Sequence, residues 1–156
     1  MIKILIVDDE KAQRESLAGF LKKIGYEIAI ADSAQTALAH MYSNPVDIVL
    51  SDYKMPYMTG ADLLQEVKSR HPGVILVLIT AFGTVDIAVD AMKAGAWDFL
   101  TKPVDLDQLE NMLEGIVRHI NERQNFDPER APIQNADSVG VIARDSAMLS
   151  ILEQAQ

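Results

Sequence analysis

The sequence of 156 residues contains no cysteine, no long apolar run and no excess of basic side chains. The absence of cysteine excludes a disulfide framework and thiol chemistry, and it suits a cytoplasmic protein. No apolar stretch approaches the roughly 20 residues that span a bilayer. The N-terminal segment becomes acidic too soon for a secretory signal. We therefore expect a cytoplasmic protein without a membrane anchor.

The charge also limits the function. The formal net charge is −9, and neither residues 1–120 nor residues 121–156 are basic. Binding to nucleic-acid phosphates needs clustered Lys and Arg, so we expect no nucleic-acid surface in this chain. The phosphate-binding loop G-x-x-x-x-G-K-[ST] is missing as well, which excludes ATP hydrolysis by that route.

Short apolar runs alternate with longer amphipathic stretches from the N-terminus to Ile120. The apolar runs predict strands at residues 2–7, 27–31, 47–50, 74–79 and 97–100. The stretches between and after them predict helices at residues 11–24, 33–41, 61–69, 84–94 and 106–120. Fivefold strand–helix alternation predicts an α/β fold, a parallel sheet covered by helices on both faces. A flavodoxin-like strand order of 2-1-3-4-5 fits this length.

The sequence changes character after Ile120. Residues 121–140 contain many turn-forming residues and little apolar periodicity, which predicts a linker. Residues 146–155 resume a helical pattern, and we interpret residues 141–156 as the start of another domain. The predicted helix 106–120 has apolar residues at alternating spacings of three and four. This spacing fits packing on the sheet and equally permits a partner helix, so dimer contact remains open.

Polar residues that could bind a ligand or take part in a reaction lie where the predicted strands end. Asp8 and Asp9 follow the first strand, Asp52 the third, Thr80 the fourth and Lys102 the fifth. In open α/β sheets, ligands bind outside the carboxyl ends of the strands, where the strand order reverses. We therefore expect these five side chains to converge in one crevice.

Three crowded carboxylates repel one another, and a pair about 4 Å apart costs about 4 kcal/mol at an effective dielectric constant of about 20. Such a cluster is tolerable if it binds a hard cation, and oxygen ligands favour Mg²⁺. A cation, Lys102 and the Thr80 hydroxyl would then stabilise a phosphoryl group, with one carboxylate as the nucleophile.

Each residue alone has an ordinary explanation. Asp9 could cap the first predicted helix, and Thr80 could satisfy a backbone group at a strand end. Lys102 could be a solvated loop residue. Their joint occurrence at the ends of four strands favours the functional interpretation.

Four segments resemble the receiver domains of two-component response regulators, and the match covers residues 1–120 as one domain. The segments are ILIVDDE (4–10), VLSDYKMPYMTG (49–60), LITAFGT (78–84) and AWDFLTKP (96–103). The resemblance implies that Asp52 is the phosphoacceptor and that Mg²⁺ is bound by Asp8, Asp9, Asp52 and the backbone carbonyl of Lys54.

The same resemblance implies a switch and a partner. Lys102 matches the lysine that contacts the phosphoryl group, and Thr80 and Phe99 match the hydroxyl and aromatic switch positions. A sensor histidine kinase would supply the phosphoryl group. Phosphorylation would then alter the face formed by residues 84–120, through which, with the linker, a homodimer is possible.

Residues 81–103 look like those of nitrogen-regulator-type transcription activators, which carry an AAA+ ATPase and a DNA-binding domain downstream. Residues 139–156 are similar to the start of that ATPase domain. We therefore expect a piece of a longer regulator that contacts DNA through a domain absent from this chain.

Two rival functions remain open. One is a pseudo-receiver, a protein-interaction module that is never phosphorylated. The other is a haloacid-dehalogenase-type phosphatase, but such an enzyme normally has an acid two residues after its nucleophile, and position 54 is Lys. We expect no multiple-turnover enzyme activity.

Overall fold

The computed structural model describes residues 1–81 and 84–125, which contain a five-stranded parallel sheet. The strands are β1 (Lys3–Val7), β2 (Glu27–Ala31), β3 (Ile48–Asp52), β4 (Ile75–Thr80) and β5 (Asp98–Thr101). Their order in the sheet is β2-β1-β3-β4-β5, and every neighbouring pair is parallel. The predicted fold class and strand order are therefore confirmed.

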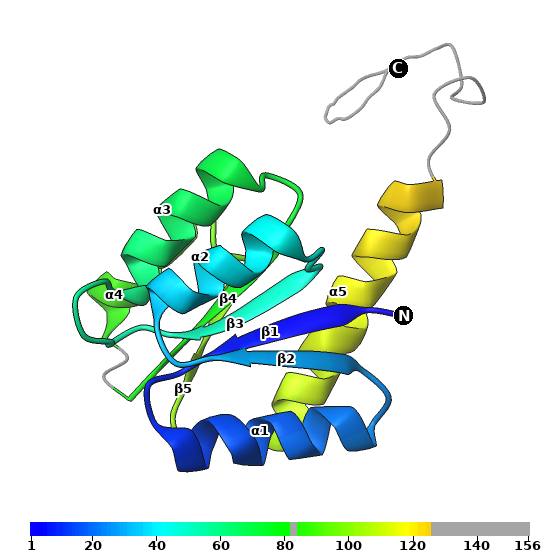
Figure 1. Cartoon of the computed structure of the whole chain (residues 1–156), viewed down its shortest axis with the longest axis horizontal. Helices are drawn as coiled ribbons and strands as arrows, with labels where there is room; N and C mark the ends of the chain where they lie inside the picture. The colour runs from blue at the N-terminus through cyan, green and yellow to red at the C-terminus, as the bar shows by residue number, and fades with distance from the viewer. Residues whose placement is uncertain (82–83, 126–156) are drawn as a thin grey trace. The chain divides into compact units, whose positions relative to one another are not determined.

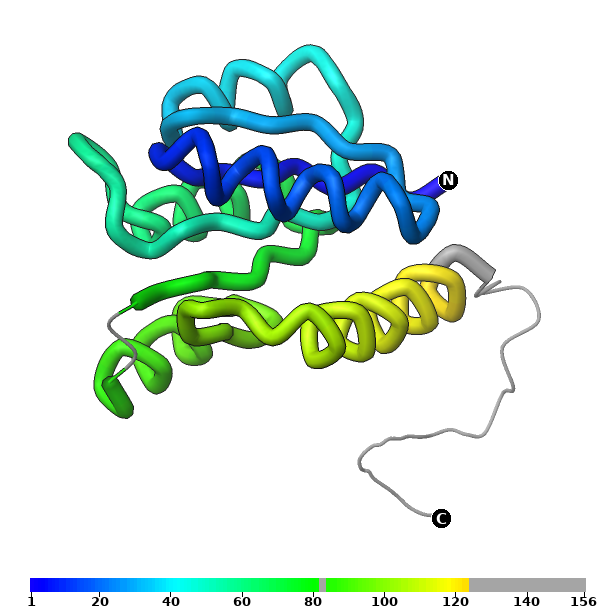
Figure 2. The backbone as a smooth tube through the Cα atoms, turned by 90° about the horizontal axis from the view of Figure 1, so that it is seen from below, coloured from blue at the N-terminus to red at the C-terminus, as the bar shows by residue number. Residues whose placement is uncertain are grey.

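Five helices connect and follow the strands: α1 (Lys11–Lys23), α2 (Ala34–Ser43), α3 (Gly60–Arg70), α4 (Val85–Lys93) and α5 (Leu106–Asn125). Figure 1 shows α2, α3 and α4 on one face of the sheet and α1 and the start of α5 on the other. Figure 2 follows the backbone through the alternating strands and helices. No helix in the described part of the chain is long and apolar enough to cross a membrane.

The chain divides into two compact units, Met1–Ile116 and Val117–Gln156, and the sheet belongs to the first. Helix α5 continues to Asn125, five residues beyond the predicted helix end, so the first five residues of the predicted linker 121–140 are helical. Residues 121–125 contain neither Gly nor Pro, which allows the helix to continue. The rest of the predicted linker and residues 141–156 lie outside the described residues.

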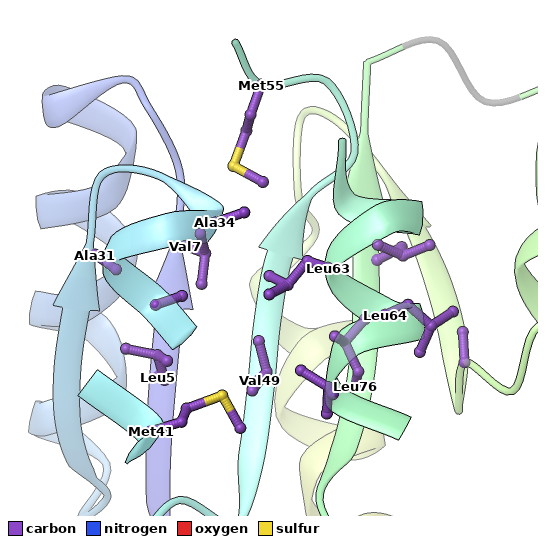
Figure 3. Close-up of a cluster of buried hydrophobic side chains, with 14 of the residues drawn as sticks. Leu5, Val7, Ala31, Ala34, Met41, Val49, Met55, Leu63, Leu64 and Leu76 are labelled. Carbon is purple, nitrogen blue, oxygen red and sulfur yellow. The ribbon is translucent and has the colours of Figure 1, made fainter. Parts of the chain in front are cut away.

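The core follows from the alternation of side chains along each strand, which sends successive residues to opposite faces of the sheet. On one face, Leu5, Val49 and Leu76 pack against α2 and α3 (Figure 3). Both helices present buried side chains to this cluster, among them Ala34, Ala37, Met41, Leu63, Leu64 and Val67. The intervening strand residues, such as Ile4, Ile6, Ile48 and Leu50, are buried on the opposite face.

Helix α3 begins one residue earlier than predicted, at Gly60, because Thr59 caps it. The Thr59 hydroxyl accepts a hydrogen bond from the Asp62 N–H (3.1 Å), and the Asp62 carboxylate accepts one from the Thr59 N–H (3.1 Å). This reciprocal capping box satisfies two N–H groups at the helix end. It also brings Gly60 against β3, where its N–H donates to the Tyr53 carbonyl (2.7 Å).

Replacing Gly60 by alanine is expected to lower the free energy of unfolding by about 1–3 kcal/mol, as for other overpacked sites. The added Cβ would lie 2.6 Å from the Asp52 carbonyl oxygen and 2.7 Å from a Leu78 methyl group. Urea unfolding followed by circular dichroism measures the change. Gly19→Ala is the control, because a Cβ at that position in α1 would meet nothing within 4 Å apart from its chain neighbours and the backbone of its own helix. This control should gain about 0.5–1 kcal/mol, and equal effects of both changes would contradict the packing described for Gly60.

Candidate functional site

Acidic side chains from two strand ends meet at the carboxyl edge of the sheet. Asp8 and Asp9 follow β1, and Asp52 is the last residue of β3, the strand next to β1 in the sheet. One carboxylate oxygen of each residue lies within 4.8 Å of the other two. Asp8 and Asp52 are buried, with 7% and 8% of their surfaces exposed, whereas Asp9 is exposed. The predicted convergence of the three acids is therefore present.

Lys102 bridges the two buried acids. Its Nζ lies 3.3 Å from Asp8 Oδ2 and 3.3 Å from Asp52 Oδ2. The backbone of Lys102 continues the sheet beyond β5, because its N–H donates to the Thr80 carbonyl (2.8 Å). The peptide bond between Lys102 and Pro103 is cis. One cation thus faces three carboxylates, and the cluster retains an excess of negative charge.

Local hydrogen bonds fix the orientation of Asp8. Its Oδ1 accepts from the Glu10 N–H (2.9 Å), and its carbonyl accepts from the Arg14 guanidinium (2.8 Å). The N-cap position of α1 is Glu10 rather than Asp9, and the Glu10 side chain makes no capping hydrogen bond. The alternative that Asp9 is simply a helix cap therefore has no support in the geometry.

Burial raises the pKa of the Asp52 carboxyl, and the Lys102 ammonium lowers it. The negative charge of Asp8 raises the pKa further, whereas a hydrogen bond from the Lys54 backbone lowers it, and the net pKa lies above the ordinary 3.8. Burial alone would lower the pKa of Lys102, but Asp52 and Asp8 together raise it above 10.5. Lys102 therefore stays charged at neutral pH, and ionised Asp52 is held at an energetic cost.

The remaining predicted residues lie at or near the same edge. Thr80 ends β4 and is buried, with 1% of its surface exposed. Lys54 follows Asp52 in the exposed part of the loop after β3. Phe99 lies within β5, is partly buried and packs against the core cluster. Its distance from Thr80 along the sheet is small, since Leu78 pairs with Phe99 and Thr80 with Thr101.

A cleft of about 590 Å³ opens over Asp52. Its walls include Asp9 and Gln13 on one side, Met55 and Pro56 on another, and Lys102. A second groove of about 430 Å³ adjoins it between α1 and the segment after β5, and Asp8 and Lys102 line both this groove and the site. The cleft gives a small ligand direct access to Asp52 from solvent.

The chemistry of these ligands fits a hard divalent cation. All three acids offer oxygen, two of them are buried, and Lys102 neutralises only part of their charge. Oxygen-only sites with room for water suit Mg²⁺. The cluster can thus hold such an ion beside the Asp52 carboxylate.

Two residues of the site were missed by the sequence analysis. Arg14 holds the Asp8 carbonyl, and Gly60 packs against the Asp52 carbonyl. The T-x-x-D spacing of Thr59 and Asp62 is a signal for the helix start that brings Gly60 there. Arg14 has no comparable signal, because its partner lies across a turn at the helix entrance.

Comparison with known proteins gives a consistent result. The family described as response regulator receiver domain matches residues 4–114. The chain is 37% identical over 153 residues to the transcriptional regulatory protein ZraR of Salmonella typhimurium, covering 98% of this chain and 34% of that protein. It is 34% identical over 146 residues to the DNA-binding transcriptional regulator NtrC of Klebsiella pneumoniae, covering 94% of this chain and 30% of that protein. The chain therefore spans about a third of the length of these relatives.

Solved structures agree. A response regulator receiver domain protein from Clostridium thermocellum superposes with a TM-score of 0.73 at 32% identity, covering 78% of this chain and 98% of that chain. A CheY-like receiver domain protein from Methanospirillum hungatei gives a TM-score of 0.72 at 32% identity over 78% of this chain and 98% of that chain.

The raised pKa of Asp52 leads to a stability prediction. Between pH 3.8 and the folded-state pKa, the folded protein binds more protons than the unfolded chain, so stability falls as pH rises. Asp52→Asn is therefore expected to raise the free energy of unfolding at pH 7 in metal-free buffer, and this gain should shrink below pH 3.8. Urea titrations at several pH values measure it.

The matched control is Asp90→Asn, at an exposed position in α4. It should change the free energy of unfolding by less than about 0.5 kcal/mol at every pH. If Asp52→Asn were less stable than the unaltered protein at pH 7, burial of the ionised carboxylate would not be the dominant effect.

Proposed function

The chain belongs to the family of response regulator receiver domains, and on that premise we propose that it accepts a phosphoryl group on Asp52 from a sensor histidine kinase. Receiver domains of response regulators interact with histidine kinases. The observation that most supports the proposal is the cluster of three carboxylates within 4.8 Å, with Lys102 3.3 Å from two of them. The arrangement supplies the Asp52 carboxylate as a nucleophile, the Lys102 ammonium as a cation, and carboxylates that can bind a metal ion.

Receiver domains bind Mg²⁺ at an acidic pocket. In this chain we assign the ligands as Asp8, Asp9 and Asp52, together with the backbone carbonyl of Lys54. When bound, the ion supplies positive charge that offsets the charge on the phosphoryl oxygens.

The proposed reaction uses the side chains of the site directly. An Asp52 carboxylate oxygen attacks the phosphorus of a phosphohistidine, and the P–N bond breaks with its electron pair returning to the imidazole nitrogen. The Lys102 ammonium binds a phosphoryl oxygen and stabilises the charge in the transition state. Water later attacks the phosphorus of the mixed anhydride and releases phosphate, which restores the Asp52 carboxylate. The chain would thus catalyse only its own phosphorylation and dephosphorylation, and we expect no other substrate that it converts with multiple turnovers.

The switch would couple this chemistry to β5. The Thr80 hydroxyl would donate a charge-assisted hydrogen bond to the new phosphoryl group. Its movement would leave space into which Phe99 can turn. Phosphorylation would thereby shift an existing equilibrium between two arrangements of the 84–120 face.

An exposed apolar surface supports the proposal that this face binds a second copy of the chain. Val85, Val89 and Met92 are 79%, 43% and 47% exposed and recur at helical spacing along α4. Trp97 and Leu106 are also exposed, at 37% and 41%. By contrast, Leu109, Leu113, Ile116 and Ile120 are fully buried, so most of the apolar stripe of α5 is not available to a partner.

The output would be transcription. Two of the relatives are named as transcriptional regulators, ZraR and the DNA-binding NtrC, and both extend well beyond the matched part. We propose that residues 1–120 form the receiver domain, that residues 121–140 are the linker, which begins within the last turns of α5, and that residues 141–156 begin an AAA+ ATPase-like domain. DNA would be bound by a domain further on, and the protein would act in the cytoplasm.

The phosphatase alternative is not supported, since the family is that of receivers and position 54 is an exposed Lys. The pseudo-receiver alternative remains a competing proposal. A test for phosphorylation of Asp52 distinguishes the pseudo-receiver from the proposed function.

Incubation with phosphoramidate and Mg²⁺ is expected to add one phosphoryl group, a gain of about 80 Da in intact mass. Asp52→Asn should abolish the gain, and Asp90→Asn, at an exposed position, should leave it unchanged. Removal of Mg²⁺ with EDTA should slow the reaction by at least about tenfold, because the charge on the phosphoryl oxygens is then less well offset. A missing mass gain in the unaltered chain would favour the pseudo-receiver.

Phe99→Ala is expected to leave the rate of phosphorylation within about twofold, because the ring does not line the cleft over Asp52. It should abolish any change in association caused by beryllofluoride, a mimic of the phosphoryl group, as measured by light scattering. Phe20→Ala, at a partly buried ring in α1, controls for loss of an aromatic side chain elsewhere. An unaltered response to beryllofluoride in Phe99→Ala would exclude Phe99 as the switch.

A further inference from the structure

The loop between β3 and α3 contains an unusual backbone turn next to the site. Tyr57 has a φ of 70°, and the Met58 N–H donates to the Pro56 carbonyl (2.8 Å) across it. This is a γ-turn with a positive central φ, a rare and strained form that favours glycine. Among the non-glycine residues in the described part of the chain, Tyr57 is the one with positive φ.

The Tyr57 ring is not buried in the fold, so its packing does not offset the strain of the turn. Tyr57 is 98% exposed, whereas Met55 on one side of the turn is 6% exposed and Met58 on the other packs against the core cluster. Figure 3 shows the Met55 side chain pointing from the loop into that cluster. The two methionines thus anchor the loop, and the turn between them holds the Tyr57 ring in solvent. Strained backbone of this kind often lies at functional sites.

The turn borders the entrance to Asp52. Met55 and Pro56 line the cleft over Asp52, and Tyr57 is the next residue. A protein that inserts a phosphorylated side chain into this cleft must cover its rim, whereas a small phosphodonor can enter without touching Tyr57. Tyrosine is enriched at the energetic centres of interfaces, because it offers a large ring at a low cost in side-chain entropy.

From this arrangement we infer that Tyr57 is a contact residue for the protein that donates the phosphoryl group to Asp52, and that it sets the affinity for this donor and leaves the chemical step unchanged. The inference rests on the proposed function of Asp52. Tyr57 is therefore a specificity residue for the phosphohistidine-bearing partner, outside the catalytic groups themselves.

The test compares two donors on three variants. Tyr57→Gly removes the ring and relieves the backbone strain of the turn. Tyr57→Phe keeps the ring. Tyr42→Ala removes another highly exposed tyrosine. Tyr42 is 88% exposed on α2, close to the start of β3 and thus at the opposite edge of the sheet from the cleft. The donors are phosphoramidate and the autophosphorylated sensor kinase that transfers fastest to the unaltered chain.

With the kinase donor, Tyr57→Gly is expected to lower kcat/KM by about tenfold or more, mainly through a higher KM, as for loss of an interface anchor. Tyr57→Phe and Tyr42→Ala should stay within about threefold of the unaltered chain, since both keep the ring at position 57. With phosphoramidate, every variant should react at the unaltered rate. The urea midpoint of Tyr57→Gly should equal or exceed that of the unaltered chain, because glycine fits the turn.

Three results would overturn the inference. An unchanged kcat/KM for phosphoryl transfer from the kinase to Tyr57→Gly would show that Tyr57 does not contact the donor. A comparable loss with phosphoramidate would mean that the change distorts the site itself. A comparable loss in Tyr42→Ala would mean that exposed tyrosines matter generally. Failure of phosphoramidate to modify Asp52 in the unaltered chain is a different result, which refutes the proposed function and with it this role for Tyr57.

Discussion

The repulsion among three carboxylates at one edge of the sheet is the constraint on which the rest of the structure depends. Like charges a few ångströms apart repel by several kcal/mol even at an effective dielectric constant of about 20. Asp8 and Asp52 are buried as well, so neither is screened freely by water. Lys102 offsets part of this repulsion, and the apolar sheet supplies the stability that keeps the acids together. The core thus supports a site that would not assemble by itself.

The loops around the site are fixed by contacts of different kinds. The loop after β1 is held by polar bonds, from the Glu10 N–H and the Arg14 guanidinium to Asp8. The loop after β3 is held mainly by packing, through Met55 and the close approach of Gly60 to the Asp52 carbonyl. Both loops are therefore held by contacts where they present the acids, whereas Tyr57 is exposed to solvent between Met55 and Met58, which contact the core.

Strand β5 connects the site to the exposed apolar surface. Lys102 directly follows this strand and bonds the Thr80 carbonyl, while Phe99 lies three residues before Lys102 and pairs with Leu78. A displacement at Thr80 or Lys102 would be carried along paired backbone to the region of Trp97 and α4. This short path is the physical basis of the proposed coupling between Asp52 and the 84–120 face.

The sequence by itself determined the elements of the first 120 residues, the parallel order of the strands and the gathering of Asp8, Asp9 and Asp52, because apolar periodicity and strand-end positions are local properties. The tertiary structure alone decided the specific contacts within that crevice: Lys102, which the sequence placed near the acids, contacts Asp8 and Asp52, and Gly60 packs against the Asp52 carbonyl. It also decided the positive φ of Tyr57. A glycine at this position would have indicated such a conformation from the sequence, whereas a tyrosine does not. Such features depend on packing between residues that are far apart in the sequence, and a local sequence pattern does not reveal that packing.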